Sequence, residues 1–213
     1  MAKMSVSEFF DGYSRDFNAI YGSENTSFNR VIDRLFRKSM SLRYTKSLEG
    51  CEQIEGGSVL DIGCGPGHYS VALALKGATR VVGIDFAHGM IELAQKNAEQ
   101  GGVGRRCEFV TADFMTYPFK ETFDYSIVMG FMDYVRDARP VVERVLSLTR
   151  SRAFFSFPVA GGLLAWQRRL RYRGRCDLFL YNLDQVERLF RDLGRTQAKV
   201  ERISRDFFVS VSK

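Results

Sequence analysis

The sequence predicts an α/β fold with a Rossmann-like, doubly wound sheet that is mostly parallel and has an antiparallel closing strand. Three observations carry this prediction. Short apolar runs alternate with stretches of helical spacing through the middle of the chain, which is typical of strand–helix–strand units. A glycine-rich turn at residues 63–67 directly follows the first of these runs. The last two runs are joined by a short connection, which allows them to pair antiparallel at one edge.

The expected elements of the parallel sheet lie between residues 58 and 157. The segment Ser58–Ile62 is a short apolar run that ends at glycines, as a buried parallel strand does. The further expected strands are Arg80–Asp85, Cys107–Thr111, Asp124–Met129 and Arg152–Phe157, and the expected helices are His68–Lys76, His88–Gln100 and Arg139–Leu148. In the second of these helices the apolar residues fall on one face.

The pattern differs at the two ends of the chain. The N-terminal part has helical spacing in two pieces, and the alternation of strand and helix stops after Pro158. The elements expected there are helices at Ser5–Tyr21, Thr26–Glu49, about Gly161–Tyr172 and Asn182–Leu193, followed by strands at Gln197–Ile203 and Asp206–Val211. Asn182 is expected to be the N-cap of its helix.

The composition excludes several classes of protein. Of the 213 residues, 45% are hydrophobic and 26% are charged, which is ordinary for a globular chain. No run approaches the ~18 consecutive apolar residues of a membrane span, and the N-terminus carries acidic residues where a signal peptide needs an apolar block. Four scattered cysteines without a CxxC pair and two histidines leave zinc sites without ligands. No metal is expected, because Asp133 is the only acidic residue near the expected acceptor position, where a metal site would need a cluster of them. The same cysteines suit a reducing compartment, so a cytoplasmic location is expected.

The glycine-rich turn carries the strongest chemical signal. Gly63, Gly65 and Gly67 give the spacing GxGxG, which lets a ligand approach backbone N–H groups at a helix N-terminus. A dinucleotide site would need GxGxxG, and Asp61, just ahead of the turn, would repel a pyrophosphate. The Asp61 carboxylate instead suits a cationic ligand, because it can accept from an ammonium group and favour a sulfonium electrostatically.

Two further carboxylates follow the next two strands. Asp85 ends the second strand about 20 residues past the glycines, where it can accept hydrogen bonds from both hydroxyls of a ribose. Asp113 follows the third strand and can accept from an adenine amino group, while Phe114 and Met90 offer apolar faces to the ring. In the alternative interpretation Asp85 is a helix N-cap, Asp113 a turn residue and Met90 plain core.

These sites, in this order, resemble the class I S-adenosylmethionine-dependent methyltransferases that act on small molecules. The resemblance runs from Val59 to about Pro158 and rests on the segments VLDIGCGPG, VVGID and FVTAD and on the segment after the fourth strand. It implies S-adenosyl-L-methionine as the methyl donor and S-adenosyl-L-homocysteine as the product. It also implies that the donor's methionine end, ribose and adenine follow the first, second and third strand ends. The implied site residues are Asp61, Gly63, Cys64, Gly65, Gly67, Asp85, Phe86, Met90, Asp113, Phe114, Met129 and Gly130.

The resemblance also divides the chain. Residues 1–57 would form a helical N-terminal lid, and residues 58–213 the methyltransferase domain, with an acceptor-region insertion at about 158–181. In the N-terminal part, Tyr21 is the candidate to touch the donor, and Arg43 could meet the donor carboxylate. For Arg43 the alternative is a solvated helix face.

The expected reaction transfers a methyl group to an oxygen or nitrogen nucleophile on a small, anionic and partly apolar metabolite, by in-line displacement. Because a sulfonium is already activated, alignment and exclusion of water can carry most of the rate, so no catalytic residue is singled out. Asp133 and Tyr134 could orient the acceptor, or could be polar surface at a strand end. The alternatives are methylation of RNA or protein, and binding of S-adenosylmethionine without catalysis. The GxGxG spacing argues against an NAD-dependent Rossmann protein.

The net charge of +6 points to the acceptor region. Residues 1–157 contain 19 basic and 19 acidic residues, whereas residues 158–213 contain 12 basic and six acidic residues, which is the whole excess. Five of these basic residues lie between Arg168 and Arg175, in a stretch with several aromatic residues. This pattern suits an acceptor with a hydrophobic body and acidic groups. RNA, which is not favoured, an anionic lipid and a solvated helix face are the alternatives.

Overall fold

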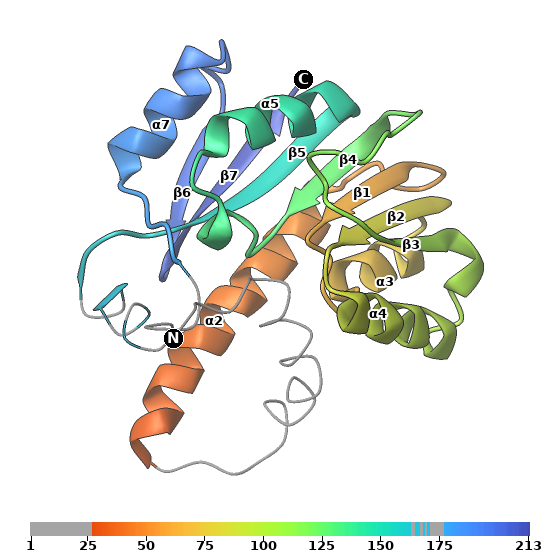
Figure 1. Ribbon diagram of the computed structural model, residues 1–213, viewed down its shortest axis with the longest axis horizontal. Coiled ribbons are helices and arrows are strands. Elements are labelled where there is room, and N and C mark those ends of the chain that lie inside the picture. Colours follow the sequence, from red (N-terminus) through yellow and green to blue (C-terminus); the bar gives the residue numbers. More distant parts are fainter. Residues whose placement is uncertain (1–26, 163–164, 167, 169, 171–176) are drawn as a thin grey trace.

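The computed structural model describes residues 27–162, 165–166, 168, 170 and 177–213, with side chains from Lys38 onward. Its centre is a seven-stranded sheet with the strand order β3-β2-β1-β4-β5-β7-β6 (Figure 1). The strands are β1 (Ser58–Ile62), β2 (Arg80–Asp85), β3 (Cys107–Thr111), β4 (Phe123–Val128), β5 (Thr149–Pro158), β6 (Lys199–Ile203) and β7 (Asp206–Ser212). The expected helix Ser5–Tyr21, which includes Tyr21, lies outside the described residues.

The strand directions confirm the predicted sheet. Neighbouring strands from β3 to β5 are parallel, and β7 is antiparallel to both β5 and β6. β6 and β7 are joined by a turn of two residues, Ser204 and Arg205, in which Ser204 has a φ of 56°. A connection this short makes the antiparallel pairing of β6 and β7 necessary, because a parallel pair needs a long crossover.

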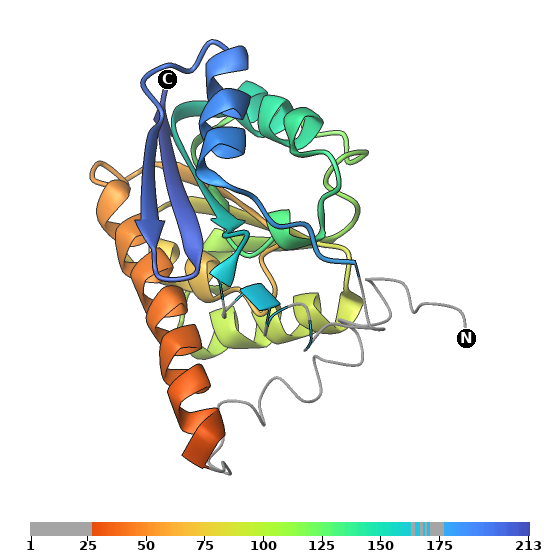
Figure 2. The same ribbon diagram turned by 90° about the vertical axis from the view of Figure 1, so that its left-hand side faces the viewer.

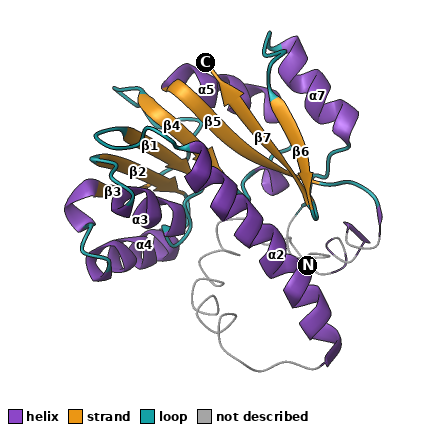
Figure 3. Ribbon diagram, turned by 180° about the vertical axis from the view of Figure 1, so that it is seen from behind, coloured by secondary structure: helices purple, strands orange, loops and turns teal. Residues whose placement is uncertain are grey.

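Helices cover both faces of the sheet (Figures 2 and 3). The helices are α2 (Ser27–Gly50), α3 (His68–Leu75), α4 (His88–Gln100), α5 (Ala138–Leu148) and α7 (Leu183–Asp192), with short 3₁₀ turns η1 (Gly104–Arg106) and η2 (Met132–Tyr134). Helices α2, α3 and α4 lie on one face, and α5 and α7 on the other. Each face has its own core, because strand residues alternate sides: Leu60 packs with the α5 side, and Val59 with the α3 side.

Most expected boundaries agree closely with the observed ones. β5 begins at Thr149 rather than Arg152, because Thr149 already pairs with Phe123 of β4 and its hydroxyl donates to the Val145 carbonyl at 2.7 Å. β4 ends at Val128, so Met129 belongs to the loop after the strand and not to the strand.

The segment after β5 is only partly described. Helical backbone is seen at residues 162, 165, 166, 168 and 170, within the expected helix at 161–172. α7 begins as expected at the N-cap Asn182, whose side chain accepts from the Gln185 backbone at 2.8 Å while the Gln185 side chain accepts from the Asn182 backbone at 2.9 Å.

Candidate functional site

The glycine-rich turn is held between β1, β2 and α3. The backbone N–H groups of Gly63 and Cys64 both donate to the Ile84 carbonyl, at 2.8 and 3.2 Å. Gly63 has a φ of 65°, and a Cβ there would lie 2.7 Å from the Phe131 ring. Gly65 has a φ of 52° but faces open space, so a side chain there would enter the volume in front of the turn. The turn therefore requires glycine both for its backbone conformation and for close approach.

Asp85 ties the end of β2 to this turn. One carboxylate oxygen accepts from the Gly65 N–H at 3.0 Å, and the other accepts from the Ala87 N–H at 2.9 Å. The N-cap of α4 is Ala87, so the interpretation of Asp85 as that N-cap is wrong. The half-buried carboxylate thus anchors the loop.

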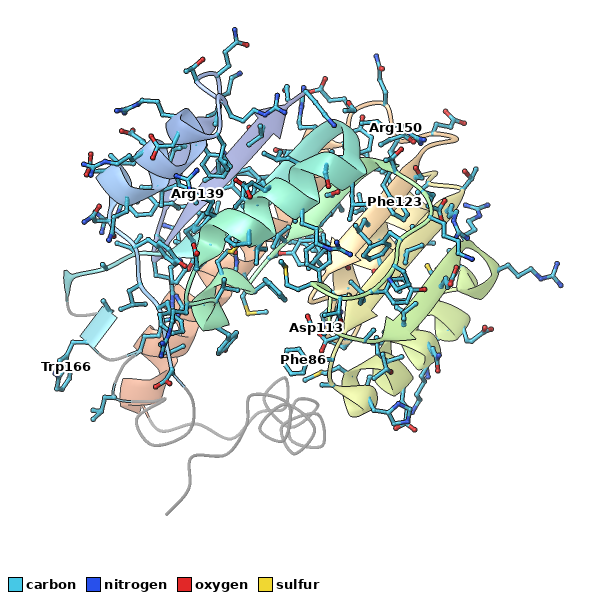
Figure 4. All side chains as sticks on the ribbon, turned by 45° about the horizontal axis from the view of Figure 1, so that its top comes forward. Phe86, Asp113, Phe123, Arg139, Arg150 and Trp166 are labelled. Atoms are coloured by element: carbon cyan, nitrogen blue, oxygen red, sulfur yellow. The ribbon has the colours of Figure 1, made fainter. Side chains whose placement is uncertain are left out.

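Two adjoining cavities form one cleft at the carboxyl ends of β1, β2 and β4. Their volumes are about 190 and 370 Å³, and the larger lies within the range of small-molecule sites. The residues that line both cavities are Gly63, Asp85, Phe86, Phe131 and Tyr134. Of the expected donor residues, Arg43, Gly63, Cys64, Gly65, Asp85, Phe86, Met90, Met129 and Gly130 line the smaller cavity, and Asp113 and Phe114 line the larger one. Figure 4 labels Phe86 and Asp113 at this end of the sheet.

Asp61 and Gly67 do not line the cleft. Gly67 stands at the start of α3 with a φ of 75°, and a Cβ there would lie 3.0 Å from the Ala94 side chain. Asp61 is only 1% exposed, and one of its oxygens accepts from the Ser70 hydroxyl at 2.6 Å. A direct hydrogen bond from a ligand in the cleft to Asp61 therefore does not fit this structure, whereas the expected contact through water stays a prediction. The carboxylate lies beneath the turn because β1 points it toward α3.

Burial also changes the charge of Asp61. Loss of hydration raises the pKa of Asp61 to about 7, although the Ser70 hydrogen bond opposes this rise. At pH values between the ordinary pKa of an aspartate and about 7, Asp61 then holds a proton in the folded state that it has lost in the unfolded state. Stability consequently falls as pH rises through this window.

The variant Asp61→Asn is expected to remove this pH dependence, because asparagine does not titrate. The wild-type free energy of unfolding should fall by an amount on the order of 3 kcal/mol from pH 4 to pH 8 relative to the variant. Urea unfolding of both proteins across this range measures the difference. Parallel pH profiles for the two proteins would contradict a raised pKa at Asp61.

Arg43 reaches the cleft from α2. It is 9% exposed, its Nη1 donates to the Ser156 hydroxyl at 3.3 Å, and its Nε lies 3.7 Å from an Asp206 carboxylate oxygen. The Ser156 hydroxyl also accepts from the Gly130 N–H at 2.8 Å. The interpretation of Arg43 as part of a solvated helix face is therefore wrong. Its Nε is buried beside Asp206 without a hydrogen bond, and the residue lines the smaller cavity.

The larger cavity has a polar residue and aromatic residues at its edge. Asp113 is a turn residue, since one carboxylate oxygen accepts from the Met115 N–H at 2.8 Å, but it also lines the cavity. Phe114 packs edge-on against Phe131, with ring centroids 6.5 Å apart, and the Arg144 guanidinium lies 5.4 Å from the Phe114 ring centre. A flat apolar ring with hydrogen-bond donors fits these surroundings.

Some residues of the cleft carried no signal in the sequence. Met40 lines the smaller cavity from α2, and His68 and Tyr69 line it from α3. Burial lowers the pKa of His68 and therefore favours its neutral form. Burial likewise raises the pKa of Cys64 well above its usual range, so this residue is a thiol and not a thiolate nucleophile.

Two charged residues expected at the acceptor side are buried. Asp133 in η2 is 2% exposed and accepts from Arg168, which is 8% exposed and also donates to Asp206 at 3.1 Å. Asp133 is therefore not polar surface at a strand end, and Arg168 is not on a solvated helix face. Their burial follows from pairing, which the sequence did not reveal. The other arginines of the cluster, Arg169, Arg171, Arg173 and Arg175, lie outside the described residues.

Within the part of the chain that the structure describes, the helices are too short or too polar to span a lipid bilayer.

Comparisons with known proteins find methyltransferases. Residues 59–152 match a family model described as a methyltransferase domain. Ubiquinone biosynthesis O-methyltransferases of Pseudomonas savastanoi pv. phaseolicola and Pseudomonas putida are 32% identical to this chain over 105 residues. These matches cover 48% of this chain and 45% of each relative, so the chain matches about half the length of these curated relatives.

Solved structures resemble the whole chain. Magnesium protoporphyrin IX methyltransferase from Synechocystis PCC 6803 with bound SAM has a TM-score of 0.74 at 19% identity, over 100% of this chain and 99% of that one. A DhpI–SAM–HEP complex has a TM-score of 0.69 at 15% identity, over 99% of this chain and 100% of that one. At these identities the likeness establishes a shared fold. Residues 59–152 of the chain therefore match a methyltransferase domain, in agreement with the resemblance on which the prediction from the sequence rests.

Proposed function

We propose that this protein transfers the methyl group of S-adenosylmethionine to an oxygen or nitrogen nucleophile on a small, anionic and partly apolar metabolite. The observation that carries the proposal is the cleft, where Asp85, the turn at Gly63–Gly65 and the loop at Met129–Gly130 converge. The described cysteines Cys51, Cys64 and Cys107 are free, which supports a reducing, cytoplasmic setting as part of the proposal.

The residues of the cleft fit the chemistry of this donor. The buried Arg43 lines the smaller cavity, and its guanidinium would hold the donor carboxylate. Asp85 would accept from the ribose hydroxyls, and Asp113 and Phe114 would hold the adenine in the larger cavity. Open space before Gly65 would admit the donor close to the backbone. Bound in this way, the donor supplies an already activated methyl group.

The protein's part in the reaction is then alignment and exclusion of water. The loop after β4 would set the direction from which the nucleophile approaches, since Gly130 is fixed through Ser156 to Arg43. Tyr134 lines both cavities beside this loop and would orient the acceptor. Phe131 covers the glycine-rich turn and would keep water from this part of the cleft.

The names of the relatives support a small acceptor. The curated relatives are called ubiquinone biosynthesis O-methyltransferases, and the structural relative is a methyltransferase of magnesium protoporphyrin IX. Methylation of RNA or protein is the second candidate. It depends on the basic segment at 168–175, and the burial of Arg168 weakens it by removing one exposed charge.

The test measures donor binding and methyl transfer separately. Calorimetric titration of the full chain should show binding of S-adenosylhomocysteine and none of NAD. Labelled S-adenosylmethionine should then pass its methyl group to the small-molecule fraction of a cell extract. Label found only in RNA or protein, with steep salt dependence for RNA, would favour the second candidate. Donor binding without any labelled product would show a protein that binds the donor but does not transfer it.

A further inference from the structure

The loop that follows β3 forms one wall of the larger cavity of the cleft. It begins at Ala112, whose N–H donates to the Asp85 carbonyl at 3.0 Å, and it turns at Asp113, whose carbonyl accepts from the Tyr117 N–H at 3.0 Å. Ala112, Asp113 and Phe114 line the cavity. The shape of this wall therefore depends on what holds the loop in place.

Arg144 of α5 holds this loop through two of its carbonyl groups. The Nε of Arg144 donates to the Phe114 carbonyl at 2.9 Å, and its Nη2 donates to the Tyr117 carbonyl. Because these carbonyls are three positions apart, one planar guanidinium fixes the turn that starts at Asp113 at two points. Hydrogen bonds from a charged donor are also stronger than those between neutral groups.

The same guanidinium packs against aromatic side chains of the loop. Its central carbon lies 5.4 Å from the centre of the Phe114 ring and 5.8 Å from that of the Phe119 ring. The centres of these two rings are 5.9 Å apart, and Phe119 packs edge-on against the buried Phe123 of β4 at 6.2 Å. Arg144 therefore joins the wall of the cavity to the core by cation–π contacts as well as by hydrogen bonds.

Arg144 lies behind the wall of the cleft, because it is not among the described residues that line either cavity. Any effect of this residue on a ligand must pass through the loop that it holds. The Asp113 carboxylate accepts from the Met115 N–H at 2.8 Å, which ties the direction of that carboxylate to the same turn. A shift of the turn would consequently move the carboxylate relative to a ligand in the cavity, and recognition by hydrogen bonds tolerates only small shifts.

We propose that Arg144 is a positioning residue for the methyl donor, which holds the loop after β3 in the conformation in which Asp113 and Phe114 recognise adenine. Asp113 distinguishes adenine by accepting from its amino group, and this match depends on direction and distance. Without the two bonds from Arg144, the loop loses the geometry that makes the site selective for adenine. This inference rests on the proposed function, because it concerns the donor of the same reaction.

Arg144→Met is the test variant, because methionine keeps an unbranched apolar stem against the aromatic rings but donates no hydrogen bond. Arg144→Lys keeps the charge but loses the planar fork that reaches two carbonyls. Arg152→Met is the matched control. Arg152 is also half-buried and donates to a backbone carbonyl, that of Gly50 at 3.0 Å, but it lies near the amino end of β5, at the opposite end of the sheet from the cleft. Urea unfolding checks that each variant is folded, and Arg144→Lys carries the comparison if Arg144→Met is not.

The measured quantity is selectivity for the base, which a general loss of stability does not change. Calorimetry gives the affinities for S-adenosylhomocysteine and for S-inosylhomocysteine, which has a carbonyl where adenine has its amino group. The wild type should bind the adenine compound about tenfold more tightly, because the Asp113 carboxylate meets a hydrogen-bond donor in one ligand and an acceptor in the other.

The variants should differ in this selectivity. Arg144→Met should weaken binding of S-adenosylhomocysteine about tenfold and leave that of S-inosylhomocysteine nearly unchanged, so that most of the selectivity disappears. Arg144→Lys should lose part of the selectivity, and Arg152→Met should match the wild type. An equal loss of affinity for both ligands would mean that Arg144 only stabilises the fold, and the inference would fail.

A double variant tests whether Arg144 acts through Asp113. Asp113→Asn alone should also lower the selectivity, because an amide has donors as well as an acceptor. If the two residues act as a unit, Arg144→Met should weaken S-adenosylhomocysteine binding by a smaller factor in Asp113→Asn than in the wild type. Equal factors in the two backgrounds, or no base selectivity in the wild type, would overturn the inference while leaving the proposed function standing. Absence of S-adenosylhomocysteine binding by the wild type would instead contradict the proposed function.

Discussion

The variant Asp85→Ala is expected to weaken binding of S-adenosylhomocysteine about 100-fold or more. The carboxylate of Asp85 accepts from the Gly65 and Ala87 N–H groups, so its loss releases the glycine-rich turn from the end of β2. It also removes the proposed acceptor of the ribose hydroxyls. Hydrogen bonds to a charged group contribute about 1.5–3 kcal/mol each, and about 1.4 kcal/mol corresponds to a factor of ten in affinity. Calorimetric titration of the purified variant measures the change.

The variant Gly65→Val tests the same site by blocking it. A side chain at Gly65 points into open space before the turn, and the φ of 52° is strained for valine. The matched control is Gly102→Val, because Gly102 also has a positive φ, of 69°, and open space, but lies in the turn after α4, away from the cleft. Gly65→Val should lose donor binding while Gly102→Val retains it. Wild-type affinity in both Asp85→Ala and Gly65→Val would remove the donor site from this cleft.

The sheet and its strand ends were predictable because local pattern determines them. Apolar runs of five or six residues, helical periodicity between them and glycines after β1 are all properties of neighbouring residues. Since the carboxyl ends of parallel strands meet at one edge, the convergence of Gly63, Asp85 and Asp113 followed from the fold class alone. Gly65 and Asp85 illustrate this, because they are 20 positions apart in the sequence and the Gly65 N–H donates a hydrogen bond to the Asp85 carboxylate.

The environment of the charged residues was not predictable in this way. Asp61 follows the alternation of β1, but only the packing of α3 brings Ser70 to it and shields it from water. Arg43 and Arg168 have the sequence context of solvated basic helices. Their burial depends on Asp206, which lies at the start of the last strand and pairs with both in the folded structure. Pairing over such a separation has no periodic signal in the sequence.

The buried pairs make Arg168→Met the most destabilising of the variants considered for this fold. Arg168 donates to both Asp133 and Asp206, and its loss leaves two buried carboxylates without this partner. Removing one member of a buried ion pair typically costs about 3–5 kcal/mol, because the remaining charge is uncompensated. Arg139→Met is the control, since the Arg139–Asp192 pair is largely exposed and its loss should cost less than about 1 kcal/mol (Figure 4). Urea unfolding at pH 8 measures both free energies.

The pH dependence of this variant separates a lost charge partner from lost packing. Burial already raises the pKa of Asp133, and without Arg168 that pKa rises further. The folded variant then binds a proton that the unfolded chain does not, so the cost of Arg168→Met should shrink as pH falls from 8 to 5. Adding Asp133→Asn to the variant should recover part of the stability at pH 8, because one unpaired charge is gone. A cost that is constant with pH and unchanged by Asp133→Asn would mean that Arg168 stabilises the fold by packing alone, and that its ion pairs with Asp133 and Asp206 make no net contribution to stability.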